Sequence, residues 1–197
     1  MKKFVCLTAL CVLLLAAPAF GQFKFFVDYF SNNTGVPGDP DQTIRLTNIG
    51  ITGTPLSPNE GTICANIYVF DNNQEMVECC SCPITANGLL ELSVARDLTA
   101  NPLTSVVPVA GVVKIFPNFQ TPCSPTSFAL ITPVGDRAFS AFATHLQTTP
   151  TASFVTETII PPSSLQLQTE AGFLVQACSF VQYLGSGKGT CTCPSAP

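Results

Sequence analysis

Short stretches in which apolar and polar residues alternate follow one another along most of the chain. A period of two places successive side chains on opposite faces of an extended strand, and β-branched and aromatic residues favour that conformation. Alternation marks residues 23–30, 43–49 and 90–94. The density of β-branched and aromatic residues marks 63–70, for which 75–80 is the expected hairpin partner, and 109–116 is a further stretch of strand type. Glycine, proline and asparagine separate them, so each stretch predicts one β-strand.

The spacing of these strands predicts the fold class. Short strands at regular intervals, with a polar turn at 71–74 and a second turn at Asn87-Gly88, are typical of antiparallel sheets packed face to face. We therefore expect a mainly β protein, an antiparallel β-sandwich of immunoglobulin-like or jelly-roll-like type. Residues 136–147 fit both a helical and an alternating pattern, and we favour a strand there because the neighbouring segments are strands.

A different pattern begins at Ser163. Apolar residues then recur at steps of three and four, after Pro161-Pro162, and they are Leu165, Phe173, Leu174, Ala177, Cys178, Val181 and Leu184. Ser163 and Gln166 have the spacing of a capping box, and Gly185 supplies a stop. The pattern predicts one amphipathic C-terminal helix that packs on the sheet.

The N-terminal segment has the features of a secretory signal peptide. Two lysines precede an apolar run from Phe4 to Ala17, and cleavage after Ala19 or after Gly21 would follow small residues. We expect residues 1–21 to be the signal peptide and residues 22–197 to form a single domain. No later run is apolar for long enough to predict a transmembrane segment. The expected location is therefore outside the cytoplasm: extracellular, periplasmic or on the cell surface of a bacterium.

The charge balance argues against nucleic acid as a partner. The whole chain has a formal net charge of −4, and removal of Lys2 and Lys3 brings it near −6. A protein that follows a phosphate backbone needs a basic surface, which this composition does not supply. An unidentified protein or surface partner, or self-association, fits better.

Cysteine is the most unusual feature of the composition. Of ten cysteines, Cys6 and Cys11 lie in the signal peptide, which leaves eight in the mature chain. An even number in an oxidising compartment predicts disulfide bonds. The eight are Cys64, Cys79, Cys80, Cys82, Cys123, Cys178, Cys191 and Cys193.

Strand geometry restricts the pairing of these cysteines. Adjacent Cys79 and Cys80 point to opposite faces of an extended strand, so they need two different partners. We expect these partners to be Cys64 and Cys123, and we expect Cys178 to bond to Cys191 or Cys193.

Metal or thiol-redox chemistry is the alternative function for Cys79-Cys80-Ser81-Cys82. Cys79 and Cys82 form a C-x-x-C pattern, but Pro83 follows it and no helical pattern does, unlike the usual redox motif.

Other chemical signals are weak. His145 is the only histidine and has no carboxylate near it in sequence, so we interpret it as structural and not catalytic. Asp71, Glu75 and Glu78 lack the spacing of a calcium loop, and we interpret 185–190 as a flexible connection and not as a phosphate loop. Asn32 begins a glycosylation sequon. We assign no catalytic residue, cofactor or metal ligand.

Three elements of the sequence resemble exported cysteine-rich proteins of acidobacterial type. They are residues 64–71, the run Cys79-Cys80-Ser81-Cys82-Pro83, and the ending from Cys178 to Cys191. The resemblance implies export and a shared cysteine framework, and no assigned activity. We therefore expect a non-enzymatic, secreted or cell-surface structural or binding module.

Overall fold

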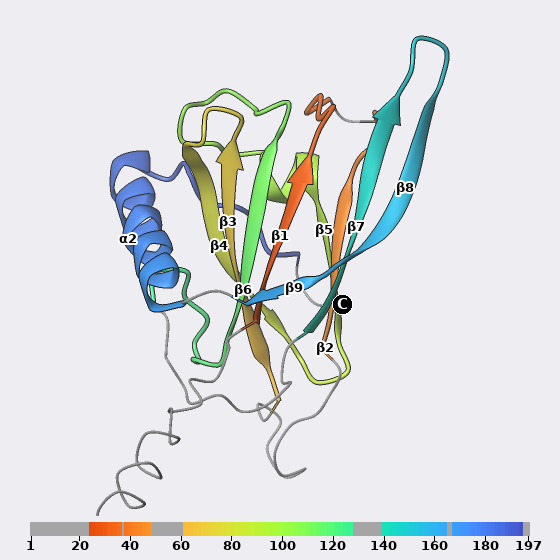
Figure 1. Cartoon of the computed structure of the whole chain (residues 1–197). Coiled ribbons are helices and arrows are strands. Elements are labelled where there is room, and N and C mark those ends of the chain that lie inside the picture. The colour runs from red at the N-terminus through yellow and green to blue at the C-terminus, as the bar shows by residue number, and fades with distance from the viewer. Residues whose placement is uncertain (1–23, 37, 49–60, 128–138, 165–166, 195–197) are drawn as a thin grey trace, which may run out of the picture.

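The computed structural model describes residues 24–36, 38–48, 61–127, 139–164 and 167–194. These residues form two antiparallel sheets and one long helix (Figure 1). One sheet has the strand order β4 (Met76–Ile84), β3 (Ile63–Asp71), β6 (Gly111–Asn118), β1 (Lys24–Phe30) and β9 (Pro162–Ser164). The other has the order β5 (Leu89–Ser93), β2 (Thr43–Asn48), β7 (Phe139–Thr148) and β8 (Ser153–Ile160). The prediction of a disulfide-bonded, mainly β sandwich with a C-terminal helix is confirmed.

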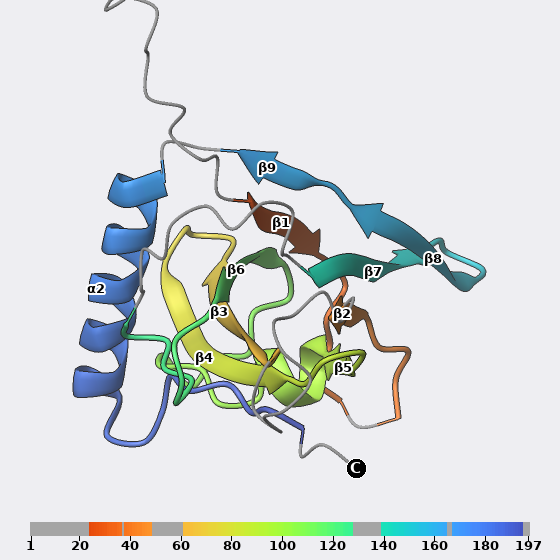
Figure 2. The ribbon, with the colours of Figure 1, turned by 90° about the horizontal axis from the view of Figure 1, so that it is seen from below.

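The two sheets and the helix form three layers (Figure 2). The helix α2 (Leu167–Gly185) lies against the outer face of the five-stranded sheet, beside β4. The main core fills the space between the sheets, and Leu46, Ile67 and Leu92 are fully buried there. A second apolar cluster lies under α2, where Leu174 and Cys178 pack near Tyr68 and Phe116.

The layers explain why β3 and β4 are buried on both faces. A sheet with one solvated face shows alternate burial, as β2 does along Thr43–Asn48. In β3 the inward residues Ile67 and Val69 face the other sheet, while Tyr68 faces α2. Continuous burial therefore replaces alternation wherever a sheet is covered by a layer on each side.

The element boundaries confirm one uncertain prediction and correct another. Of the ambiguous segment 136–147, the described residues 139–147 lie in the strand β7, as expected. The capping box is wrong, because Ser163 lies in β9 and pairs with Phe25 of β1. Local spacing favoured a helix N-terminus at Ser163, but pairing with β1 holds this residue in an extended conformation.

Three elements had no counterpart among the predictions. They are β8, β9 and a single π-helical turn at Val94–Leu98, which follows β5 directly. Ser93 caps that turn, since its side chain accepts a hydrogen bond from the Arg96 backbone N–H.

The expected signal peptide at residues 1–21 lies outside the described residues. Within the described part of the chain, no helix combines the length and apolar character needed to cross a membrane.

Candidate functional site

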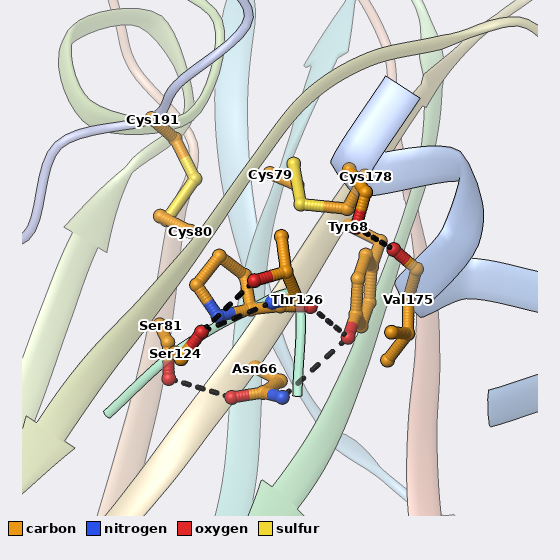
Figure 3. The surroundings of a disulfide bond; sticks show 12 residues. Asn66, Tyr68, Cys79, Cys80, Ser81, Ser124, Thr126, Val175, Cys178 and Cys191 are labelled. Carbon is orange, nitrogen blue, oxygen red and sulfur yellow. Dashed lines mark hydrogen bonds between the residues drawn. A yellow bond between two sulfur atoms is a disulfide. The ribbon is translucent and has the colours of Figure 1, made fainter. Parts of the chain in front are cut away.

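The candidate site is the cysteine-rich strand β4 and the segments bonded to it. Cys79 and Cys80 point to opposite sides of the strand, as the alternation of side chains requires (Figure 3). Cys79 faces α2 and bonds to Cys178, with an S–S distance of 2.02 Å. Cys80 and Cys82 face the core between the sheets and bond to Cys191 and Cys193.

The observed pairing corrects the expected one. Neither Cys79 nor Cys80 bonds to Cys64, because the β3–β4 register places Cys64 opposite Pro83. Cys64 instead bonds to Cys123, in the loop that follows β6. The helix covers the face to which Cys79 points, so Cys178 bonds to that strand and not to the C-terminal tail.

The face alternation also divides the sulfur cluster that was considered for metal or redox chemistry. Cys79 faces α2, so the backbone of β4 separates its sulfur from those of Cys80 and Cys82. The sulfurs of Cys80, Cys82 and Cys193 lie within 4.8 Å of one another, and those of Cys80 and Cys82 are 4.0 Å apart. A soft metal ion requires thiolate ligands, so this group could bind one only with its disulfides reduced.

The C-terminal tail runs along the free edge of β4. The Cys79 N–H donates to the Gly189 carbonyl at 3.0 Å, and the Gly189 N–H donates to the Asn101 carbonyl at 2.7 Å. On the same edge, the Leu103 N–H donates to the Val77 carbonyl. The segment expected to let Cys191 and Cys193 reach back is therefore hydrogen-bonded along β4.

Glu78 is a buried carboxyl group beside these cysteines. Its side chain is fully buried, and Oε1 accepts a hydrogen bond from the Asn101 backbone N–H at 2.8 Å. Oε2 has no hydrogen-bond partner among the described residues. Burial raises the pKa of Glu78 to about 8, while the Asn101 hydrogen bond acts in the opposite direction. The carboxyl group is therefore mostly neutral at pH 7.

A buried polar network lies on the α2 side of the sheet, beneath the loop after β6. Asn66 accepts a hydrogen bond from the Ser81 hydroxyl and its amide N–H group donates to the Ser127 carbonyl. The Tyr68 hydroxyl donates to the Pro125 carbonyl at 2.9 Å (Figure 3). Burial raises the pKa of Tyr68 to about 12. Satisfied polar groups of this kind hold a loop in one position on the sheet.

His145 has a carboxylate partner that the sequence did not reveal. Its Nε2 lies 3.1 Å from Asp28 Oδ1, on β1 of the opposite sheet, and its Nδ1 lies 3.4 Å from the Thr158 hydroxyl. The ring is buried and stacks on Tyr29. An Asp–His–hydroxyl set can relay a proton in principle, but here it also joins β1 to β7 across the two sheets.

The other candidate residues do not assemble into a site. Asp71 accepts hydrogen bonds from the Asn73 and Glu75 backbone N–H groups, which makes it a turn residue. Among the described residues, Asp71, Glu75 and Glu78 form no group with metal-ligand spacing. Asn32 of the sequon is exposed, and its amide donates to the Leu146 carbonyl.

Large apolar side chains are exposed on two elements on opposite sides of the molecule. On α2 they are Phe173, Phe180, Tyr183 and Leu184, and on β8 they are Phe154, Val155 and Ile159. Exposed apolar groups of this kind are typical of surfaces that contact a partner.

A shallow pocket of about 460 Å³ lies near the β7–β8 hairpin and is lined in part by Asn33, Val109 and Leu146.

Comparison with known proteins gives no relative for this chain. No protein-family model, no curated protein and no solved structure matches it.

Proposed function

We propose that this chain is an exported, non-enzymatic β-sandwich module that binds a partner or assembles on a surface. The observation that carries the proposal is the use of sulfur: Cys64, Cys79, Cys80 and Cys82 each bond to a distant segment of the chain. Four such bonds are typical of proteins that fold in an oxidising compartment, where disulfides persist. The signal-like residues 1–21 and the resemblance to exported cysteine-rich proteins support the same location.

Intact-mass measurement tests the redox state that this function requires. The full-length chain is expressed, and the product exported from the cell is alkylated with and without prior reduction. We expect no mass increase without reduction and eight alkyl groups after it, since four disulfides contain eight sulfurs. Alkylation of the native product would contradict the proposal.

A matched variant tests export itself. Deletion of residues 1–21 should leave the chain in the cytoplasm with reduced thiols, while the full-length chain should yield a product that begins just after Ala19 or Gly21. Cell fractionation and N-terminal sequencing measure both. Retention of the full-length chain in the cytoplasm would refute the extracellular location.

Metal binding is the second candidate function, and one observation favours it. The sulfurs of Cys80, Cys82 and Cys193 are close enough to ligate one ion, and reduction of the Cys80–Cys191 bond would free a fourth thiolate, that of Cys191. Four thiolates would suit a soft ion such as Zn²⁺. Elemental analysis of the exported product distinguishes the two functions: one equivalent of bound metal together with alkylatable thiols supports this candidate, and metal-free, fully oxidised protein rejects it.

A further inference from the structure

We propose that β8 is a pairing edge through which two copies of this chain join their four-stranded sheets into one continuous sheet. The proposal deepens the proposed function, because it names the partner of an assembling module as a second copy. The evidence comes from the four sheet edges, from the two faces of β8 and from the charge along the strand.

Three of the four sheet edges are short or covered. The tail and the Asn101–Leu103 segment hydrogen-bond along β4, and β9 has three residues, one of which is Pro162. The edge strand β5 has five residues and carries the exposed Glu91. Short length, proline, charge and covering segments are the usual means by which proteins block pairing at a sheet edge.

The fourth edge, β8, is longer than β5 and β9, has no proline and is not covered by another described segment, and its one charged residue is Glu157. It is eight residues long with the sequence SFVTETII, without proline, lysine or arginine, and it pairs without a register shift along all of its length with β7. Among the described residues, β7 is its only strand neighbour. Figures 1 and 2 show the β7–β8 hairpin extending past the other strands, on the side away from α2.

Both faces of β8 are exposed as well as its edge. Seven of its eight residues are exposed, and Phe154, Val155 and Ile159 are 50%, 50% and 70% accessible. Phe154 lies on one face of the strand, while Val155 and Ile159 lie on the other. A paired strand would shield apolar side chains on both faces and hydrogen-bond the backbone groups on the side of β8 away from β7, whereas a globular surface would contact one face alone.

Charge favours a second copy as the occupant. The chain is acidic overall, but Glu157 is the only charged residue between Gln147 and Ser164. Arg45 partly balances this charge, with Nη1 2.7 Å from Glu157 Oε1, although the same guanidinium also pairs with Glu91 of β5. The strand therefore presents a single, partly balanced charge to an identical strand, which is less repulsion than other parts of this acidic chain would give.

Glu157 also selects the register in which the two copies of β8 pair. Two antiparallel copies of β8 related by a two-fold axis pair residues of equal parity, because opposite residues share a face of the sheet. Seven residue pairs form when the axis passes through Thr156 or through Glu157. The second register places like charges opposite each other, so we infer the register centred on Thr156, with Val155 opposite Glu157.

Light scattering and a matched pair of surface variants test the interface. The exported chain should show the mass of two copies at high concentration and dissociate on dilution. Ile159→Lys should raise the dissociation constant by about tenfold or more, because it introduces a charge next to the paired edge. The control Phe173→Lys, at an exposed position on α2, should leave the constant unchanged.

Cysteine substitution tests the register independently of affinity. Opposite residues of an antiparallel pair lie about 4.5–5.5 Å apart between Cα atoms, which a disulfide can span. Thr156→Cys should therefore form a covalent dimer on mild oxidation, while Thr151→Cys in the exposed hairpin turn should not.

The outcomes separate this inference from the proposed function. A fully oxidised exported product that stays monomeric at every concentration, or a dimer indifferent to Ile159→Lys, would overturn β8 pairing and leave the exported module intact. A reduced cytoplasmic product would refute the proposed function whatever its oligomeric state.

Discussion

Glu78 is the residue whose position is least expected from its chemistry. An acidic side chain is rarely buried without a charged partner, and in this protein one carboxyl oxygen has a single backbone donor, Asn101, while the other has none among the described residues. The group is accommodated because burial raises its pKa, so it is mostly protonated inside the protein near neutral pH. Because Glu78 precedes Cys79 on β4, its ionisation would place a buried charge beside the disulfide-bonded edge of the sheet.

Stability should decline with rising pH because of Glu78. The pKa is about 4.5 in the unfolded chain and about 8 in the folded one. Between these values the folded state holds a proton that the unfolded state has lost, so the free energy of unfolding falls as pH rises and levels off above pH 8. Urea unfolding at about pH 5 and about pH 9 should show a loss on the order of a few kcal/mol.

Glu78→Gln is the control for that decline. The amide oxygen still accepts the Asn101 hydrogen bond but the side chain does not ionise. Most of the difference between the two pH values should therefore disappear. An unchanged pH dependence in this variant would show that another group is responsible.

Gly189 is a second residue with a specific steric role. Its φ is +77°, and an added Cβ would lie 2.4 Å from Val181 Cγ1. Gly187 has a similarly positive φ of +99° but open space around its Cα. Gly187→Ala should therefore cost about 1 kcal/mol from backbone strain alone, and Gly189→Ala clearly more, since it also separates the tail from α2. Thermal unfolding of the two variants measures the difference, and equal losses would contradict the steric contact.

At the scale of elements, α2 is held on the sheet by packing and by one covalent bond. Leu174 and Val181 of α2 pack in the apolar cluster between the helix and the sheet, and Cys178 of α2 bonds to Cys79 of β4. The exposed face of α2 is also apolar, so the amphipathic pattern alone does not determine which face is buried. The Cys79–Cys178 disulfide selects the buried face, because it joins one specific position of the helix to β4.

Removal of that bond should loosen the helix selectively. Replacement of both Cys79 and Cys178 by Ala should lower the free energy of unfolding by about 2–4 kcal/mol. Hydrogen exchange measured by mass spectrometry should accelerate in α2 more than in β2 or β7. The matched control replaces Cys64 and Cys123, which should accelerate exchange in the loop after β6 and leave α2 protected.

At the scale of the whole molecule, two neighbouring disulfides hold the C-terminal tail against β4. Cys80–Cys191 and Cys82–Cys193 both join residues 111 apart, and both join β4 to the tail. Either bond alone closes nearly the same large loop. The second bond therefore adds little to the restriction of the unfolded chain.

Loss of these two bonds should be strongly non-additive. Replacing either cysteine pair by Ala should cost much less than the roughly 5 kcal/mol that loop closure assigns to one loop of this length, while replacing both pairs should cost about that much. Urea unfolding of the three variants gives the comparison. Additive losses would show that the bonds act through local packing and not through loop closure.

The sequence predicted most of the fold because the signals for it are local. Alternation in β1 and β2, the β-branched and aromatic residues of β3 and the apolar spacing of α2 all involve residues a few positions apart. The prediction failed at Ser163, whose capping spacing is overridden by pairing with Phe25. It also missed the Thr- and Ile-rich β8, where β-branched residues were a usable signal.

The candidate site, like the fold, was predictable from the sequence only in part. From the sequence alone it followed that Cys79 and Cys80 have different partners, since adjacent residues of a strand face opposite sides. Which partners they have depended on the packing of α2 and of the tail, at separations of 99 and 111 residues.

The composition and local periodicity of this sequence determined a sandwich of short strands, a C-terminal helix and a disulfide framework, because these follow from short-range geometry and residue type. Only the tertiary structure decided the sulfur pairing, the burial of Glu78, the contact of His145 with Asp28 and the exposure of β8. Each of these depends on which distant segments lie side by side, and no local pattern along the chain records that.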